Sequence, residues 1–89
     1  MYAIQATVTM RTEGTSIEST TQIPTFFLDE NVQGITDETA ATGVAFEILA
    51  RPLACHTSSR FLHARSLAIG GFVFTYNITA SRVSYRALY

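Results

Sequence analysis

The stretch Tyr2-Ala-Ile-Gln-Ala-Thr-Val-Thr-Met-Arg11 alternates between two kinds of side chain. Every second residue, starting from Tyr2, is apolar or aromatic, and the intervening positions include Gln5, Thr7, Thr9 and Arg11. A period of two is typical of a β-strand with one face buried and the other in water. Residues 2–11 are therefore predicted to form a half-buried strand.

A second strand is expected directly after this one. Gly14 lies in the short polar segment 12–15, where a turn with a positive φ is expected. A β-rich run through Ile17, Thr21 and Ile23 follows, so residues 2–23 are predicted to form a long hairpin. Pro24 cannot donate to a ladder, which places it on a sheet edge or at the point where the chain leaves the sheet. Residues 25–28 are apolar without alternation and are expected to form a buried or interface-covering crossing.

The C-terminal part shows a second strongly alternating run. Residues 72–81 alternate between an apolar set, beginning with Phe72, and a set rich in Thr, Asn and Ser. Gly70-Gly71 is a two-residue hairpin signal before this run. Residues 60–69 are less regular, with apolar side chains on both sides, and are expected to form the strand on the other side of that turn.

Between the two β-rich parts, the spacing predicts one amphipathic helix. Thr36 is the expected N-cap, and the acidic residues after it suit the positive end of the helix dipole. Pro52 is expected to stop the helix, so that it ends at about Arg51. The apolar stripe that would face a sheet consists of Ala41, Val44, Ala45, Ile48 and Leu49.

These elements predict an α+β fold of order ββαββ. A four-stranded antiparallel sheet with one amphipathic helix packed on one face is the simplest way to bury both apolar sets. Residues 1–89 would form a single domain. The other face of the sheet, rich in Thr, Ser, Asn and Arg, is expected to meet solvent or a partner.

Composition limits the class of protein. With 47 % hydrophobic and 15 % charged residues, the 89-residue chain has enough apolar surface to fold, although a domain of this size is only marginally stable alone. Association with a second copy or a partner is therefore expected. The single Cys55 fits a reducing compartment, and the start of the chain lacks the pattern of a signal peptide. A cytoplasmic location, in the host cell if the chain is phage-encoded, is the resulting expectation.

Charge is unevenly distributed although the net charge is only −1. Residues 1–51 contain all seven acidic residues and two arginines. The rest of the chain has no acidic residue and four arginines, which are Arg60, Arg65, Arg82 and Arg86. Such asymmetry can mark an anion-binding or self-complementary surface. The alternative is that the two parts interleave in the fold and neutralise each other.

The four C-terminal arginines are interleaved with aromatic residues, as in sheets that bind single-stranded nucleic acid. Candidate binding residues are therefore Arg60, Arg65, Arg82, Arg86 and Tyr85. An alternative explains the aromatic residues at 72, 74 and 76 more economically, because their common phase suits a core beneath the helix. No known RNA-binding signature is present.

No residue pattern indicates catalysis or a metal site. The segment 29–37 has oxygen-bearing side chains at the spacing of a calcium loop, but Ala40 stands where the bidentate Glu is required. A capped loop between strand and helix explains it better. Cys55, His56 and His63 are too few for a structural zinc site. We therefore expect no catalytic residue, metal or cofactor, and a protein that is not an enzyme.

The stretch Ile23-Pro-Thr-Phe-Phe-Leu-Asp-Glu-Asn-Val-Gln-Gly-Ile35, followed by an Ala-rich helix, resembles a pattern in small uncharacterised proteins of bacteriophages and prophages. The resemblance implies an accessory phage protein that acts by binding, and it supplies no site residues. The predicted function is a non-enzymatic interaction protein, expected to be a homo-oligomer or homodimer. It could contact a host protein, for example as an inhibitor of a host defence system. Nucleic-acid binding is the alternative, and no membrane partner is expected.

Overall fold

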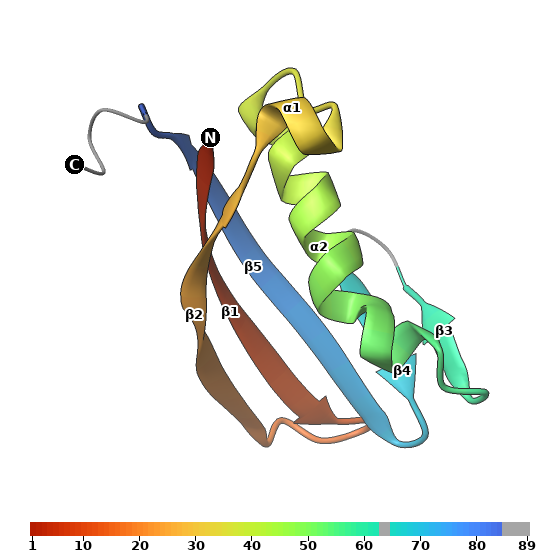
Figure 1. Ribbon diagram of the computed structural model, residues 1–89. Helices are drawn as coiled ribbons and strands as arrows, with labels where there is room; N and C mark the ends of the chain where they lie inside the picture. The colour runs from red at the N-terminus through yellow and green to blue at the C-terminus, as the bar shows by residue number, and fades with distance from the viewer. Residues whose placement is uncertain (63–64, 85–89) are drawn as a thin grey trace.

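Three long strands and one long helix make up most of the structure, a computed structural model that describes residues 1–62 and 65–84. The elements in chain order are β1 (Tyr2–Thr12), β2 (Glu18–Leu28), α1 (Glu30–Gln33), α2 (Glu38–Ala54), β3 (Ser59–Phe61), β4 (Ser66–Ile69) and β5 (Phe72–Arg82). All neighbouring strands are antiparallel, in the order β2-β1-β5-β4-β3. Figure 1 shows α2 lying across one face of this sheet, with β2 at the edge away from the helix.

The predicted alternation of β1 is confirmed by burial at residues 2–6, whereas Met10, expected on the same face, is 38 % exposed. Tyr2, Ile4 and Ala6 are buried beneath α2, whereas Gln5 lies on the opposite face and is exposed. β1 pairs with β2 on one side and with β5 on the other. The predicted N-terminal hairpin and the Gly70-Gly71 hairpin are both present, and Gly14 has the expected positive φ of 82°.

The prediction of a four-stranded ββαββ sheet is wrong, because the sheet has five strands. Residues 60–69, expected to form one strand, contain two strands that pair with each other, with Phe61 opposite Leu67. The chain reverses between them, and the amide of Leu62 donates to the carbonyl of Ser66 at 3.0 Å. This segment has apolar residues on both sides because both sides are buried. Leu67 faces α2, and Ala68 is buried on the opposite face of the sheet.

β2 is longer than expected because residues 25–28 continue the strand instead of crossing away from the sheet. Phe26 pairs with Ile4 and Ile23 pairs with Ala6, so the register shifts at this point and leaves Pro24 and Thr25 opposite Gln5. A bulge on an edge strand accommodates a proline without loss of ladder pairing. Of the two places predicted for Pro24, the sheet edge is therefore the one that the structure shows.

Both expected ends of the helix are wrong by a few residues. Asp37, with an extended backbone, is the N-cap in place of Thr36, and its carboxylate accepts from the amide of Ala40 at 2.7 Å. The helix continues through Pro52 to Ala54. Pro52 lacks the N–H that would bond four residues back, but only two further residues follow in the helix, and the amide of Cys55 still bonds to Arg51 at 3.1 Å.

The buried stripe of α2 differs from the predicted one in its second half. Ala41 and Ala45 are buried as expected, but Phe46 is buried where Ile48, at 38 % exposure, was expected. Phe46 lies edge-on to Phe61 of β3 and Tyr76 of β5, with ring centroids 6.2 and 5.6 Å away. The additional strand β3 therefore shifts the buried face of the helix. No helix among the described residues is long and apolar enough to span a membrane.

Candidate protein-protein interface

The three sequence-predicted arginines that the structure describes, Arg60, Arg65 and Arg82, each have a partner within the chain. The guanidinium of Arg60, on β3, is 3.1 Å from the carboxylate of Glu13 in the β1–β2 turn. Both side chains are about half exposed, so this ion pair contributes on the order of 0–1 kcal/mol. The contact joins a base from the C-terminal part to an acid from the N-terminal part, as the neutralisation alternative requires.

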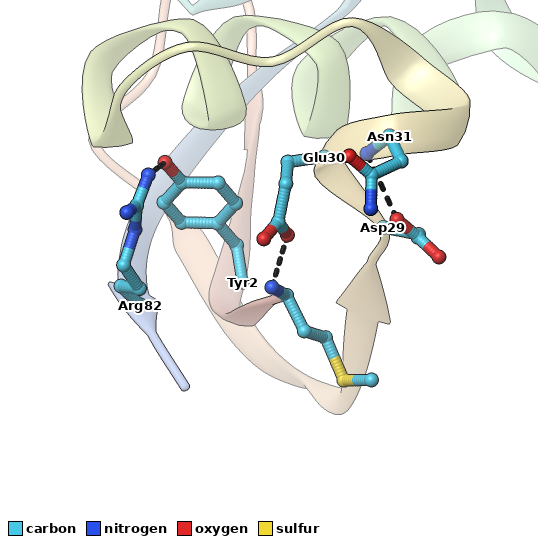
Figure 2. Close-up of polar contacts among 6 residues, drawn as sticks. Tyr2, Asp29, Glu30, Asn31 and Arg82 are labelled. Atoms are coloured by element: carbon cyan, nitrogen blue, oxygen red, sulfur yellow. Dashed lines mark hydrogen bonds and ion pairs between the residues drawn. The ribbon is translucent and has the colours of Figure 1, made fainter. Parts of the chain in front are cut away.

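Arg65 and Arg82 lie against aromatic rings. The Arg65 guanidinium is 5.4 Å from the centre of the Phe46 ring and 3.4 Å from the hydroxyl of Thr42. Arg82 is 5.3 Å from the centre of the Tyr2 ring and donates to the Tyr2 hydroxyl at 2.7 Å, as Figure 2 shows. That hydrogen bond is the main reason why the pKa of Arg82 is raised above its ordinary value. These arginines therefore stabilise the packing of the helix and of β1.

The structure does not bring the described arginines together. Arg60 pairs with Ala68, which is opposite Val73 near the start of β5, whereas Arg82 ends that strand. Val73 and Arg82 are nine residue steps apart along the strand, a distance of roughly 30 Å. The candidate residues Tyr85 and Arg86 lie outside the described residues. Nucleic-acid binding stays a prediction, and Arg60, Arg65 and Arg82 do not form one continuous surface for it.

The loop with calcium-like spacing is a capped connection. Asp29 is the N-cap of α1 and accepts from the amide of Asn31 at 2.8 Å, and Gly34 ends that helix with a φ of 67°. Figure 2 shows Glu30 paired with the amino group of Met1. This hydrogen bond is the largest cause of a lowered pKa at Glu30. Among residues 1–62 and 65–84, no three His, Cys, Asp or Glu side chains gather as they would around a metal ion.

Two of the three Cys and His residues considered for chemistry, Cys55 and His56, are at the far end of α2. Cys55 is exposed and follows the last helical residue. The Nδ1 atom of His56 is 2.9 Å from the hydroxyl of Ser58, which orders a local turn. His63 lies outside the described residues. Cys55 and His56 therefore belong to the connection between α2 and β3.

The face of the sheet opposite α2 is rich in Thr, Ser and Asn, as predicted, although Ala68 and Val73 are buried on it. A shallow groove on it is lined by Gln5, Thr7, Gln22, Asn77 and Thr79. Hydroxyl pairs link neighbouring strands on this face: Thr9 and Thr20 are 3.0 Å apart, as are Ser66 and Thr75. These hydroxyl contacts stabilise strand pairing. The residues that line the groove carry no charge.

The free edge of β2 presents unpaired backbone groups. The amide of Thr12 donates to the carbonyl of Ile17, so these two residues form a hydrogen-bonded pair next to the pair Arg11–Glu18. In an antiparallel ladder such pairs alternate with pairs that lack these bonds. Ser19 and Thr21 therefore bond to β1. The backbone N–H and C=O groups of Glu18, Thr20 and Gln22 point in the opposite direction, away from β1 and toward the open side of the strand.

Features that block strand pairing lie at one end of this edge. Native edge strands are commonly protected by proline, bulges or charge. In β2, the proline and the bulge occur together at residues 24 and 25, toward the α1 end of the strand. The seven residues 17–23 contain no proline and only one charged residue, Glu18. This segment, which we call the open edge, is exposed along its length except at Ile23, which is half-buried.

Comparison with known proteins adds no relative to these observations. No family model matches the chain, and neither a curated protein nor a solved structure matches it. The candidate interface therefore depends on the geometry of this chain alone.

Sequence reasoning offered a sheet edge as one of two places for Pro24, but it did not single out residues 17–23. The candidate residues chosen from charge include Arg60, Arg65 and Arg82, which the structure shows packed on their own chain. The open edge has almost no charge and consists mainly of Ser, Thr and Ile. Its signal in the sequence was the long hairpin closed by Pro24, because an edge binds through its backbone and needs no distinctive side chains.

Proposed function

We propose that this chain is a non-enzymatic interaction protein that acts as a homo-oligomer through the free edge of β2. The single observation behind the proposal is the open edge, a long strand segment whose outward N–H and C=O groups have no protein cover. Strand addition to such an edge is a common mode of protein recognition, in which backbone hydrogen bonds supply affinity. The small size of the domain adds a reason to associate.

The phage accessory role is part of the same proposal. The resemblance of residues 23–35 to phage and prophage proteins supports it, and a host protein would then be a further partner. Inhibition of a host defence system is one form that such binding takes. The open edge supports binding to a protein chain in general and does not select a particular host target.

Solution mass measures the homo-oligomer directly. We expect multi-angle light scattering to show a mass that rises toward twice that of the chain as protein concentration increases. Because backbone hydrogen bonds and apolar contacts hold the interface, high salt should leave this behaviour unchanged. A monomer at every concentration would overturn the homo-oligomer. Dissociation by salt would instead indicate an interface made of charged side chains.

Binding of single-stranded nucleic acid is the alternative function. Its support is the arginine and aromatic content of the C-terminal part of the chain. It predicts binding that weakens steeply with salt and weakens further in Arg82→Ala or Arg86→Ala, as measured by fluorescence anisotropy. Salt-independent or absent binding would exclude this alternative.

A further inference from the structure

The sequence of the open edge is nearly palindromic. Residues 17–23 are Ile-Glu-Ser-Thr-Thr-Gln-Ile, with Thr20 at the centre. An antiparallel pair of identical strands around a two-fold axis places residues equally distant from the centre opposite each other. Around Thr20, isoleucine would face isoleucine, glutamate would face glutamine, and serine would face threonine. A strand that pairs with its own copy requires this kind of symmetry.

We propose, resting on the homo-oligomer above, that two copies pair through residues 17–23, which are Ile17 and the first six residues of β2, with the two-fold axis at Thr20. Only residues whose backbone groups point outward can bond across the axis, which restricts the bonded pairs to Glu18, Thr20 and Gln22. With the axis at Thr20, Glu18 bonds to Gln22 of the second copy and Thr20 bonds to its own equivalent. Every outward N–H and C=O of the open edge then has a partner.

Neighbouring registers satisfy these conditions less well. An axis at Thr21 would place Glu18 opposite Pro24, which has no N–H to donate. An axis at Ser19 would place Ile23 opposite Thr15, in the turn before β2. The axis at Thr20 keeps the proline outside the paired segment. It also separates the two glutamates, because each faces a neutral amide that can donate a hydrogen bond to it.

The side chains favour the same axis. Ile17 is 74 % exposed and directly precedes β2. It has the same phase as Ile23, which packs against the core cluster that contains Phe46 and Tyr76. Pairing at Thr20 would place Ile17 of each copy opposite Ile23 of the other, in the type of pair whose side chains approach more closely. The cores of both copies would therefore be extended across the interface.

The helices leave room for this pairing. A two-fold axis perpendicular to the sheet puts both copies of α2 on the same face. Most of the contact between α2 and the sheet is with β5, two strands from the edge. Five strand spacings of about 4.8 Å would therefore separate the two copies of β5, which amounts to roughly 24 Å. Helices are about 10–12 Å in diameter, so they would not collide.

Disulfide trapping tests the register one residue at a time. Thr20→Cys, Ser19→Cys and Thr21→Cys are each made with Cys55→Ser, which removes the exposed native thiol. In the proposed register the two Thr20 Cα atoms are about 5.5 Å apart, within disulfide range. The two Ser19 Cα atoms are roughly 8 Å apart, as are the two Thr21 Cα atoms, which is too far. We expect Thr20→Cys alone to form a covalent dimer in a glutathione buffer, and Ser19→Cys mixed with Thr21→Cys to cross-link to each other.

The outcomes separate the register from the function. Cross-linking of Ser19→Cys alone or Thr21→Cys alone would move the axis and overturn the register. A mass of two chains in light scattering, with no cross-linking at residues 19–21, would overturn the use of this edge and leave the homo-oligomer standing. A monomer at every concentration would overturn both proposals. Cys55→Ser without a new thiol is the control and should not cross-link.

Amide hydrogen exchange provides a second measurement without substitutions. In the monomer, the amides of Glu18, Thr20 and Gln22 face water and should exchange quickly, whereas those of Ser19 and Thr21 are protected by β1. We expect all five to be protected at concentrations where the dimer forms. Persistent fast exchange at Thr20 in a sample shown to be dimeric would contradict the proposed pairing.

Discussion

Tyr76 shows how a single position combines the alternation of its strand with the packing of the helix. It is 6 % exposed on the face of β5 beneath α2, and its ring lies edge-on to that of Phe46. Burial raises the pKa of its hydroxyl above the ordinary value of 10.0, because the phenolate would lose its hydration. The aromatic residue that alternates with Thr75 and Asn77 is therefore a core residue rather than an exposed stacking platform.

The raised pKa of Tyr76 predicts a loss of stability at alkaline pH. Because the folded pKa lies above the unfolded one, this contribution is complete below pH about 10 and is lost as pH rises through the folded pKa. We expect Tyr76→Phe to reduce the alkaline decrease in the free energy of unfolding, measured by urea titration from about pH 8 to about pH 11. An identical decrease in both proteins would contradict the assignment to Tyr76.

At the scale of elements, α2 approaches the sheet closely because small residues line its contact face. Ala41, Ala45 and Ala50 are at most 2 % exposed. The first two belong to the cluster with Tyr2 and Ile4. An alanine at a buried helix position leaves no space for a longer side chain unless the helix moves away. The spacing between helix and sheet is therefore set by these positions.

Enlarging one of these alanines should destabilise the fold. We expect Ala45→Leu to lower the free energy of unfolding by about 1–3 kcal/mol, because the added methylene and methyl groups overpack the interface. Glu47→Leu adds the same side chain at an exposed position of the same helix and should change stability by no more than about 0.5 kcal/mol. Urea denaturation followed by circular dichroism measures both. Equal effects of the two substitutions would contradict the close packing at Ala45.

At the scale of the whole molecule, the two ends of the described chain meet in the middle of the sheet. β1 and β5 pair along their full length, from Tyr2 opposite Arg82 to Thr12 opposite Phe72. The same arrangement brings the acidic N-terminal part beside the basic C-terminal part. Arg60 pairs with Glu13, and Arg82 lies in the electrostatic field of Glu30 and Glu38. At these two places the acidic and basic parts of the sequence lie against each other.

This topology predicts slow folding for so short a chain. The central pairing joins residues separated by most of the sequence, and such loops must close before their contacts stabilise the fold. We expect refolding on a scale of milliseconds to seconds, as for other β-rich domains with distant strand pairing. Stopped-flow fluorescence of the tyrosines, at concentrations below dimer formation, measures the rate. Refolding in microseconds would contradict the β1–β5 pairing.

The sequence by itself determined the local features of this protein. The alternation at Tyr2–Arg11 and after Phe72, the turn at Gly14 and the edge position of Pro24 depend on backbone geometry and a period of two, which neighbouring residues specify. The α+β class and one helix-covered face follow from these patterns. The predicted ends of the helix were wrong because local signals compete there. Thr36 and Asp37 are both good N-caps. Pro52 removes one backbone hydrogen bond, which the last turn of a helix tolerates.

Tertiary structure alone decided the order of the strands and the places of Arg60, Arg65 and Arg82. The placement of β5 beside β1, and the division of residues 60–69 into two strands, depend on contacts between distant segments that no local pattern encodes. Those contacts direct Arg65 and Arg82 onto aromatic rings of their own chain. They also leave β2 at the edge of the sheet, where no other strand covers residues 18–23, and the proposed self-pairing depends on this position. The alternation of apolar and polar side chains depends on adjacent residues. Which strands pair with each other depends on how the whole chain buries its apolar side chains.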